Sequence, residues 1–174
     1  GWALKQLLKK DFEINQGDIE DGFDALDISQ VKDFLKGNDA VISAGPFKVN
    51  KNIAKIAAEQ GVAYFDLTED VETTDFIKTL DSKNILMPQC GLAPGAINIC
   101  AASMMKEFDS VNEVLMRVGA LPRFTTNEMS YYLSWSTNGL INEYCNEADA
   151  IYEGKAVKLM PLEGIEKIVI EGES

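Results

Sequence analysis

The chain has 174 residues, of which 46% are hydrophobic and 25% charged, a composition typical of one sizeable soluble domain or parts of two. Its net charge of -12 provides no basic surface for nucleic acid or an anionic membrane, so we expect neither as a partner. Because histidine is absent, Ser-His-Asp triads are excluded, and so is the commonest metal ligand.

The apolar runs and the cysteines of the sequence bear on membrane insertion, metal binding and cellular location. No apolar run approaches the ~20 residues that span a bilayer, and the opening GWALKQLLKK lacks the small-residue cleavage site of a signal peptide. Cys90, Cys100 and Cys145 are widely spaced and form no CxxC pair. We therefore expect no metal site, no disulfide framework, and a reducing cytoplasmic location.

The first part of the chain predicts short elements. Apolar residues within 2–8 have helical spacing, and residues 12–18 alternate like a short strand that ends in a turn. Residues 23–29 alternate in the same way. Residues 29–37 predict a helix, with Ser29 as its N-cap and Gly37 at its end.

Residues 39–108 alternate between strands and helices. Compact apolar runs at 39–47, 62–68 and 84–90 predict strands buried on both faces, and 49–61, 69–80 and 96–108 predict helices. This βαβ order is typical of an α/β fold with a doubly wound parallel sheet, whose ligands bind at the carboxyl ends of the strands.

The pattern changes after residue 108. A longer strand is expected over 111–121, an aromatic-rich helix over 127–144, a hairpin over 151–159 with Glu153 and Gly154 at its turn, and a last strand over 166–172. We therefore predict two domains, residues 1–109 and residues 110–174, the second of α+β class.

The three predicted strand ends share one edge of the sheet. After the first, SAGPF places Gly45 and Pro46 where backbone could approach a flat nucleotide, although the motif taken alone favours a plain turn. After the second, DLTED gathers Asp66, Glu69 and Asp70. Asp66 either faces a substrate amine or is structural, whereas Glu69 and Asp70 fit a first helical turn capped by Thr68.

After the third strand, CGLAPG contains two glycines that permit positive φ and a proline that stiffens the turn. The helix that follows offers free N–H groups to an anion or a carboxamide, and the alternative is a rigid connecting loop. Further along, SWSTNGLINEYCN is unusually rich in polar and aromatic residues. It is either a binding wall or an amphipathic helix with an exposed face.

These motifs together resemble the saccharopine dehydrogenase family, closest to its lysine 6-dehydrogenase-like branch. The resemblance rests on DLTED, CGLAPG and WSTNGLINEY in that order, and it is clearest over residues 39–164. It implies a Rossmann-like domain that binds NAD or NADP, and a second domain for substrate binding and dimerisation. It also implies hydride transfer between the nicotinamide and the amine-bearing carbon of an amino acid such as lysine or saccharopine.

The resemblance assigns residues to this site. Along the cofactor it implies Ser43, Ala44, Gly45, Pro46, Phe47 and Thr68, and at the nicotinamide end Gly91, Leu92, Ala93, Pro94 and Gly95. It implies Asn138, Glu143 and Tyr144 on the substrate side. For the ammonium or proton role we select Asp66 and Glu143.

One departure concerns the start of the chain. Family members begin with a strand and a G-x-G-x-x-G loop, whereas this chain begins with what resembles the helix after that loop. Gly1 would then be the last glycine of the loop. Asp18 would be the acid that meets the ribose, which favours NAD over NADP. We expect a Rossmann-like sheet incomplete at its N-terminus, part of a second domain, and a longer natural protein.

Two functions remain open on these residues. The first is an NAD(P)-dependent amino-acid dehydrogenase, expected as a homodimer. The second is a non-catalytic nucleotide-binding or oligomerisation module on the same fold.

Overall fold

The structure is a computed structural model that describes residues 1–119, 124, 132–133, 137–164 and 166. The chain divides into two compact units, Gly1–Phe124 and Thr125–Ser174, each treated by itself below. The division predicted after residue 109 stays a prediction. Within the described ranges, no helix is long and apolar enough to cross a membrane.

A parallel sheet of three strands forms the centre of the first unit. Its strands are β1 (Ala40–Ser43), β2 (Ala63–Asp66) and β3 (Leu86–Met87), in the order β1-β2-β3. The register pairs Ser43 with Asp66 and Phe65 with Met87. The predicted α/β class with parallel strands is therefore confirmed, and the carboxyl ends of the strands lie at one edge.

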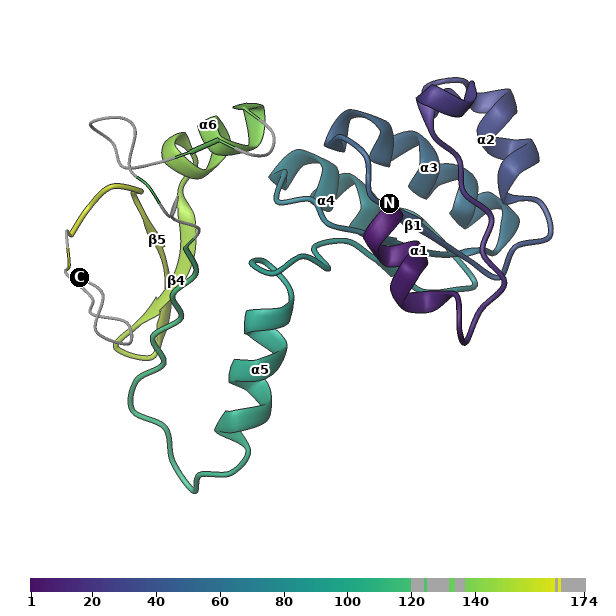
Figure 1. Ribbon diagram of the computed structural model, residues 1–174. Helices are drawn as coiled ribbons and strands as arrows, with labels where there is room; N and C mark the ends of the chain where they lie inside the picture. The colour runs from purple at the N-terminus through teal and green to yellow at the C-terminus, as the bar shows by residue number, and fades with distance from the viewer. Residues whose placement is uncertain (120–123, 125–131, 134–136, 165, 167–174) are drawn as a thin grey trace. The chain divides into compact units, whose positions relative to one another are not determined.

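Three helices cover one face of this sheet (Figure 1). They are α2 (Ile28–Leu35), α3 (Phe47–Gln60) and α4 (Val71–Lys78). α3 contacts β1 and β2 directly and lies between α2 and α4. Its contact surface includes Ala54 and Ala57, both fully buried, because only small side chains allow a helix to approach a sheet closely.

The core consists of the sheet-facing sides of these helices and the facing strand residues. Its buried apolar members are Val31, Leu35, Val49, Ile53, Ala54, Ile56, Ala57, Val62, Tyr64 and Ile77. The prediction of strands buried on both faces is wrong for the described residues. Ile42 and Met87, on the opposite face, are 41% and 47% exposed, because the helix layer covers one face only.

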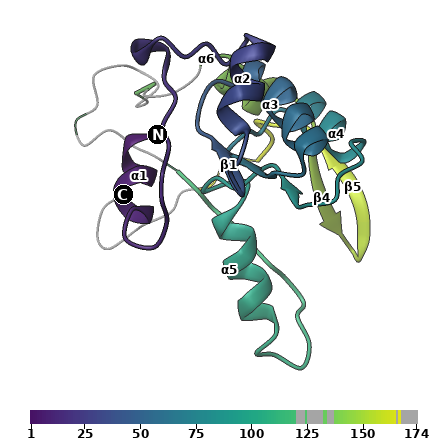
Figure 2. The ribbon, with the colours of Figure 1, turned by 90° about the vertical axis from the view of Figure 1, so that its right-hand side faces the viewer.

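The other two α-helices of this unit contain no buried residue. They are α1 (Trp2–Leu8) and α5 (Ala96–Met105), and in both views α5 extends away from the helix layer (Figure 2). The strand predicted over residues 12–18 is wrong. This segment is irregular and leads into the short 3-10 helix η1 (Ile19–Asp21), because a strand requires a neighbour with which to form its hydrogen bonds.

Side-chain caps explain where the helices begin. α2 begins after Asp27, whose carboxylate accepts from the N–H groups of Ser29 and Gln30, so Ser29 is not the N-cap. α4 begins after Asp70, which accepts from the N–H of Thr73 at 2.8 Å, so Thr68 is not its cap. Asp70 therefore has a structural role, as expected, but it is the cap itself and not a residue of the first turn.

The second unit contains a helix and a hairpin. These are α6 (Thr137–Cys145), β4 (Ala148–Tyr152) and β5 (Lys155–Leu159), with β4 and β5 antiparallel. Glu153 and Gly154 form the turn with φ of 49° and 74°, as the predicted hairpin requires. The strand predicted over 111–121 is irregular as far as residue 119, and its last two residues, like most of 166–172, lie outside the described residues.

Candidate functional site

Asp66 is the centre of the edge where the three strands end. Its side chain is fully buried, and the carboxylate accepts four hydrogen bonds. One oxygen accepts from the Tyr64 hydroxyl at 2.7 Å and from the Asn50 amide at 3.2 Å. The other oxygen accepts from the backbone N–H groups of Thr68 at 3.0 Å and Gln89 at 3.1 Å.

The first strand joins this arrangement through α3. The Ser43 hydroxyl donates to the Asn50 side-chain oxygen at 2.7 Å, and Asn50 donates to Asp66. We call this set, Ser43, Asn50, Tyr64 and Asp66 with the backbone of Thr68 and Gln89, the strand-end network. It links residues that follow all three strands and is almost wholly buried.

Burial also governs the ionisation of Tyr64. Its pKa is raised far above the ordinary value of 10, first by burial and then by its hydrogen bond to Asp66. Tyr64 therefore stays protonated and acts as a donor at any physiological pH. The pKa of the nearby Cys90 thiol is also raised, mainly by burial and further by the charge of Asp66. A thiol in this state is a poor nucleophile.

The loop 91–95 is folded against itself. Gly91 and Gly95 form a backbone bridge, and the N–H groups of Ala96 and Ile97 return to the carbonyls of Gly91 and Leu92. Gly95 has φ 138°, and a Cβ there would lie 2.1 Å from the Gly91 carbonyl oxygen. The two glycines therefore permit contact of the loop with itself. Gly91 also lies close to the carbonyl of Leu67, beside the end of β2.

The N-terminus of α3 faces the same edge. Pro46 is its N-cap and supplies no side-chain hydrogen bond, so the first N–H groups have no cap of that kind. A Cβ at Gly45 would contact only Val49. Ser43, Ala44 and Gly45 thus present little side-chain bulk between β1 and α3, which begins at Phe47 after its N-cap Pro46.

The remaining predicted site residues occupy other places. Asp18 caps η1 by accepting from the N–H of Glu20, and Gly1 precedes α1 as an exposed residue. Asn138, Glu143 and Tyr144 are exposed on α6 in the second unit. The structure thus groups Ser43, Asp66, Thr68 and Gly91 at one edge, while their roles, and those of the α6 residues, stay predictions.

Sequence analysis missed Asn50, Tyr64 and Gln89. Asn50 is 1% exposed on the apolar face of α3, and a polar residue among Val49, Ile53 and Ala54 is the signal that marks it. Gln89 has φ 64°, which only the structure reveals. No signal in the sequence distinguishes Tyr64 from an ordinary core aromatic.

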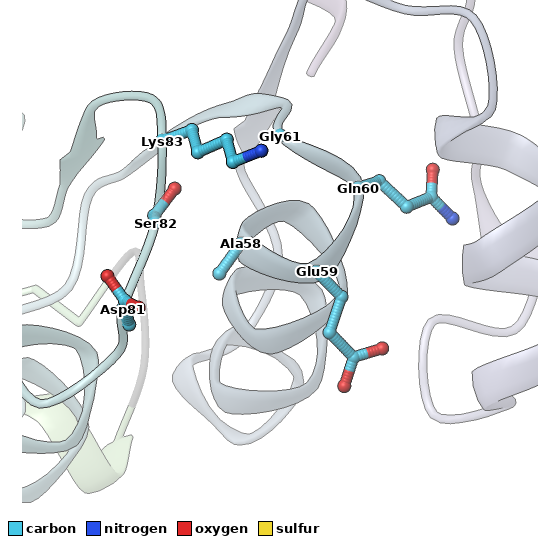
Figure 3. Close-up of a pocket in the computed structure, with 7 residues that line it drawn as sticks. All are labelled: Ala58, Glu59, Gln60, Gly61, Asp81, Ser82 and Lys83. Atoms are coloured by element: carbon cyan, nitrogen blue, oxygen red, sulfur yellow. The ribbon is translucent and has the colours of Figure 1, made fainter.

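One surface hollow lies elsewhere. It is lined by residues 58–61 at the end of α3 and residues 81–83 before β3, as Figure 3 shows. These residues precede β2 and β3, so the hollow is at the opposite end of the strands from the strand-end network. Its lining mixes Glu59, Asp81 and Lys83 without a buried polar group. Among the described residues, no group of three or more Cys, Asp or Glu could hold a metal ion.

Comparisons with known proteins agree with this architecture. Residues 91–173 match the family model of the saccharopine dehydrogenase C-terminal domain. The structure is similar to that of apo histidine-tagged saccharopine dehydrogenase (L-Glu forming) from Saccharomyces cerevisiae, with a TM-score of 0.53 and 22% sequence identity. The match covers 79% of this chain and 33% of the yeast enzyme chain. The chain therefore spans about a third of the length of the yeast enzyme. At this identity, the structural match supports the fold alone.

Proposed function

The chain belongs to the saccharopine dehydrogenase family, and from this membership we propose that it is part of an NAD(P)-dependent oxidoreductase acting on an amino acid. The observation that carries the proposal is the edge of the parallel sheet where the strand-end network, the uncapped start of α3 and the loop 91–95 meet. In open α/β sheets, this edge is where nucleotides bind.

The residues at this edge fit a nicotinamide cofactor. Ser43, Gly45 and the backbone of 44–47 would lie along it, with Thr68 beside them and the loop 91–95 at the nicotinamide end. NAD or NADP would supply the hydride chemistry, between its ring and the amine-bearing carbon of a substrate such as lysine or saccharopine. The residues of the chain would hold the cofactor in position.

The substrate side of the proposal uses α6. Glu143 is an exposed carboxylate, and Asn138 and Tyr144 are exposed polar residues on the same helix. We propose that Glu143 meets the substrate ammonium or accepts its proton, while Asn138 and Tyr144 bind the rest of the substrate. The protein is proposed to be a cytoplasmic homodimer, because Cys90, Cys100 and Cys145 are free thiols and α5 exposes Ile99, Met104 and Met105.

The test measures cofactor binding before activity. NADH and NADPH are titrated into the protein while nicotinamide fluorescence is recorded. Lysine and saccharopine are then screened with NAD⁺ or NADP⁺ as the hydride acceptor, and formation of reduced cofactor is followed. Gly45→Val places a side chain where we propose the cofactor lies, and it should weaken binding at least about tenfold. Gly119→Val is the matched control, because a Cβ there meets no atom of the described residues within 4 Å.

Three outcomes decide between the functions. Binding that is weakened by Gly45→Val alone, followed by oxidation of an amino acid, supports the dehydrogenase. Binding without oxidation supports the non-catalytic nucleotide-binding module. If neither cofactor binds, the proposal is wrong.

A further inference from the structure

The four partners of the Asp66 carboxylate are all hydrogen-bond donors. They are the Tyr64 hydroxyl, the Asn50 amide and the N–H groups of Thr68 and Gln89. A carboxylate has about four lone-pair sites in the plane of its oxygens, so these donors occupy its capacity. The side chain is also 0% exposed. A substrate proton would therefore have to displace an existing partner within the protein interior.

Asp66 holds the segment after β3 at two points. Its carboxylate accepts from the N–H of Gln89 at 3.1 Å, and its backbone carbonyl accepts from the N–H of Cys90 at 2.7 Å. Between them Gln89 has φ 64°, a left-handed conformation that is unfavourable for a residue with a side chain. The bonds to Asp66 offset that cost and determine where the loop 91–95 begins.

Asp66 also determines the orientation of groups after β1. Because its oxygen can only accept, the Asn50 amide must present its N–H₂ to Asp66 and its oxygen to Ser43. The Ser43 hydroxyl must then donate to Asn50, which leaves its oxygen as an acceptor for other groups. One carboxylate thus sets the donor and acceptor directions across α3 to the end of β1.

From these contacts we propose that Asp66 is a positioning residue of the candidate cofactor site and not its acid or base. Through Asn50, Thr68 and Gln89 it holds the segments after β1, β2 and β3 in one fixed arrangement. The proposal rests on the proposed function for its ligand. Its structural part, control of the segment after β3, stands without a ligand.

The experiment uses two readouts on the same variants. Hydrogen exchange of Gln89 and Cys90 reports the position of the segment after β3, and steady-state kinetics with the cofactor report kcat and KM separately. Asp66→Ala removes the carboxylate, so exchange should become roughly tenfold to hundredfold faster at Gln89, and the cofactor KM should rise. Asp66→Asn keeps an oxygen for the two backbone N–H groups, so exchange should stay close to that of the unmodified protein.

Asp70→Asn is the matched control. Asp70 follows the same strand, and its carboxylate accepts from the backbone N–H of Thr73 at the start of α4. The Asp70→Asn variant should leave hydrogen exchange at Gln89 and Cys90 unchanged.

Exchanging the carboxylate and the amide between residues 66 and 50 tests the donor and acceptor directions of the hydrogen bond that joins them. Asp66→Asn alone turns an N–H₂ group toward the N–H₂ group of Asn50, and it should weaken cofactor binding roughly threefold to tenfold. Adding Asn50→Asp restores an acceptor for both Ser43 and residue 66, so binding should recover. This pair decides the question where Asp66→Ala fails to fold.

The outcomes separate the two proposals. An acid or base at this position predicts that Asp66→Asn lowers kcat by roughly a hundredfold or more with unchanged exchange and KM, which would overturn the positioning role. Unchanged exchange in Asp66→Ala, or no recovery in the swap, would overturn it as well. If the protein binds neither NADH nor NADPH, the proposed function fails, and exchange at Gln89 still decides whether Asp66 holds the segment after β3.

Discussion

Replacing Gly95 by alanine tests whether the loop 91–95 has the shape described here. Gly95 has φ 138° and ψ -103°, a region that residues with a Cβ avoid at a cost of ~1–3 kcal/mol. The added Cβ would also lie 2.1 Å from the Gly91 carbonyl oxygen and 2.7 Å from the Gly91 nitrogen. Both neighbours are backbone atoms, so no side-chain rotation can relieve the overlap.

The expected loss of stability is the sum of the backbone strain and the overlap of the added Cβ with Gly91. Overpacking of this kind costs ~1–3 kcal/mol, so we expect Gly95→Ala to lower the free energy of unfolding by about 2–6 kcal/mol. Urea denaturation followed by far-ultraviolet circular dichroism measures this change. Hydrogen exchange of Ala96 and Ile97, whose N–H groups bond to Gly91 and Leu92, shows whether the damage begins in the loop.

Two other glycines provide graded controls in the same unit. Gly61 has φ 70° with nothing within 4 Å of an added Cβ, so Gly61→Ala should cost only the left-handed penalty of ~1–2 kcal/mol. At Gly45 a Cβ would meet Val49 at an ordinary 3.4 Å, and Gly45→Ala should change stability by less than ~0.5 kcal/mol. The reasoning is refuted if Gly95→Ala unfolds at the same urea concentration as the unmodified protein, or is milder than Gly61→Ala.

Further predictions concern three polar side chains of the same unit, those of Tyr64, Thr74 and Cys90. Tyr64→Phe removes a hydrogen bond to Asp66 and should lower the free energy of unfolding by about 1.5–3 kcal/mol in urea denaturation. Because the pKa of Tyr64 is raised in the folded protein, its contribution is complete below the ordinary tyrosine pKa of 10 and declines above it, so the alkaline decline in melting temperature should be smaller in Tyr64→Phe. Thr74 is 3% exposed, and its hydroxyl has no hydrogen-bond partner among the residues that the structure describes, so Thr74→Val should raise the free energy of unfolding by up to about 1 kcal/mol; a marked loss would show that the hydroxyl has a partner. Cys90 should be alkylated more slowly by iodoacetamide than the exposed Cys100 at neutral pH, because burial raises its pKa; mass spectrometry of the peptides measures the order, and faster labelling of Cys90 would contradict it.

Local patterns in the sequence predicted the helices and the parallel strands of the first unit well. The 3.6-residue spacing of Val49, Ile53 and Ala57, closed by Gly61, marks α3 because those residues meet the sheet on one side. Residues 12–18 show the limit of the same reasoning. Alternation predicts which side chains share a face, but a strand forms only where another strand supplies hydrogen bonds, and spacing alone contains no information about that partner.

The candidate site was only partly predictable because its contacts are distant in the sequence. Motifs after each strand identified Ser43, Asp66 and Gly91 as neighbours, since parallel strands bring their carboxyl ends together. Two of the donors to Asp66 are Asn50 and Gln89, which lie outside the DLTED motif that drew attention to Asp66. A strand-end aspartate can be catalytic or structural, and only its partners decide between the two.

Gly91 and Gly95, which flank Leu-Ala-Pro, were also only partly predictable from the sequence. From the sequence, this segment is either a binding site that ends at the following helix or a rigid connecting loop, and in the structure Gly91 and Gly95 approach each other. These explanations are compatible if the loop is shaped before the ligand arrives. Asp66 holds the segment at Gln89 and Cys90, and the Gly91–Gly95 bridge closes the turn that follows. A loop fixed at both points loses little conformational entropy on binding, so its shape would contribute to affinity without any side chain that contacts the ligand.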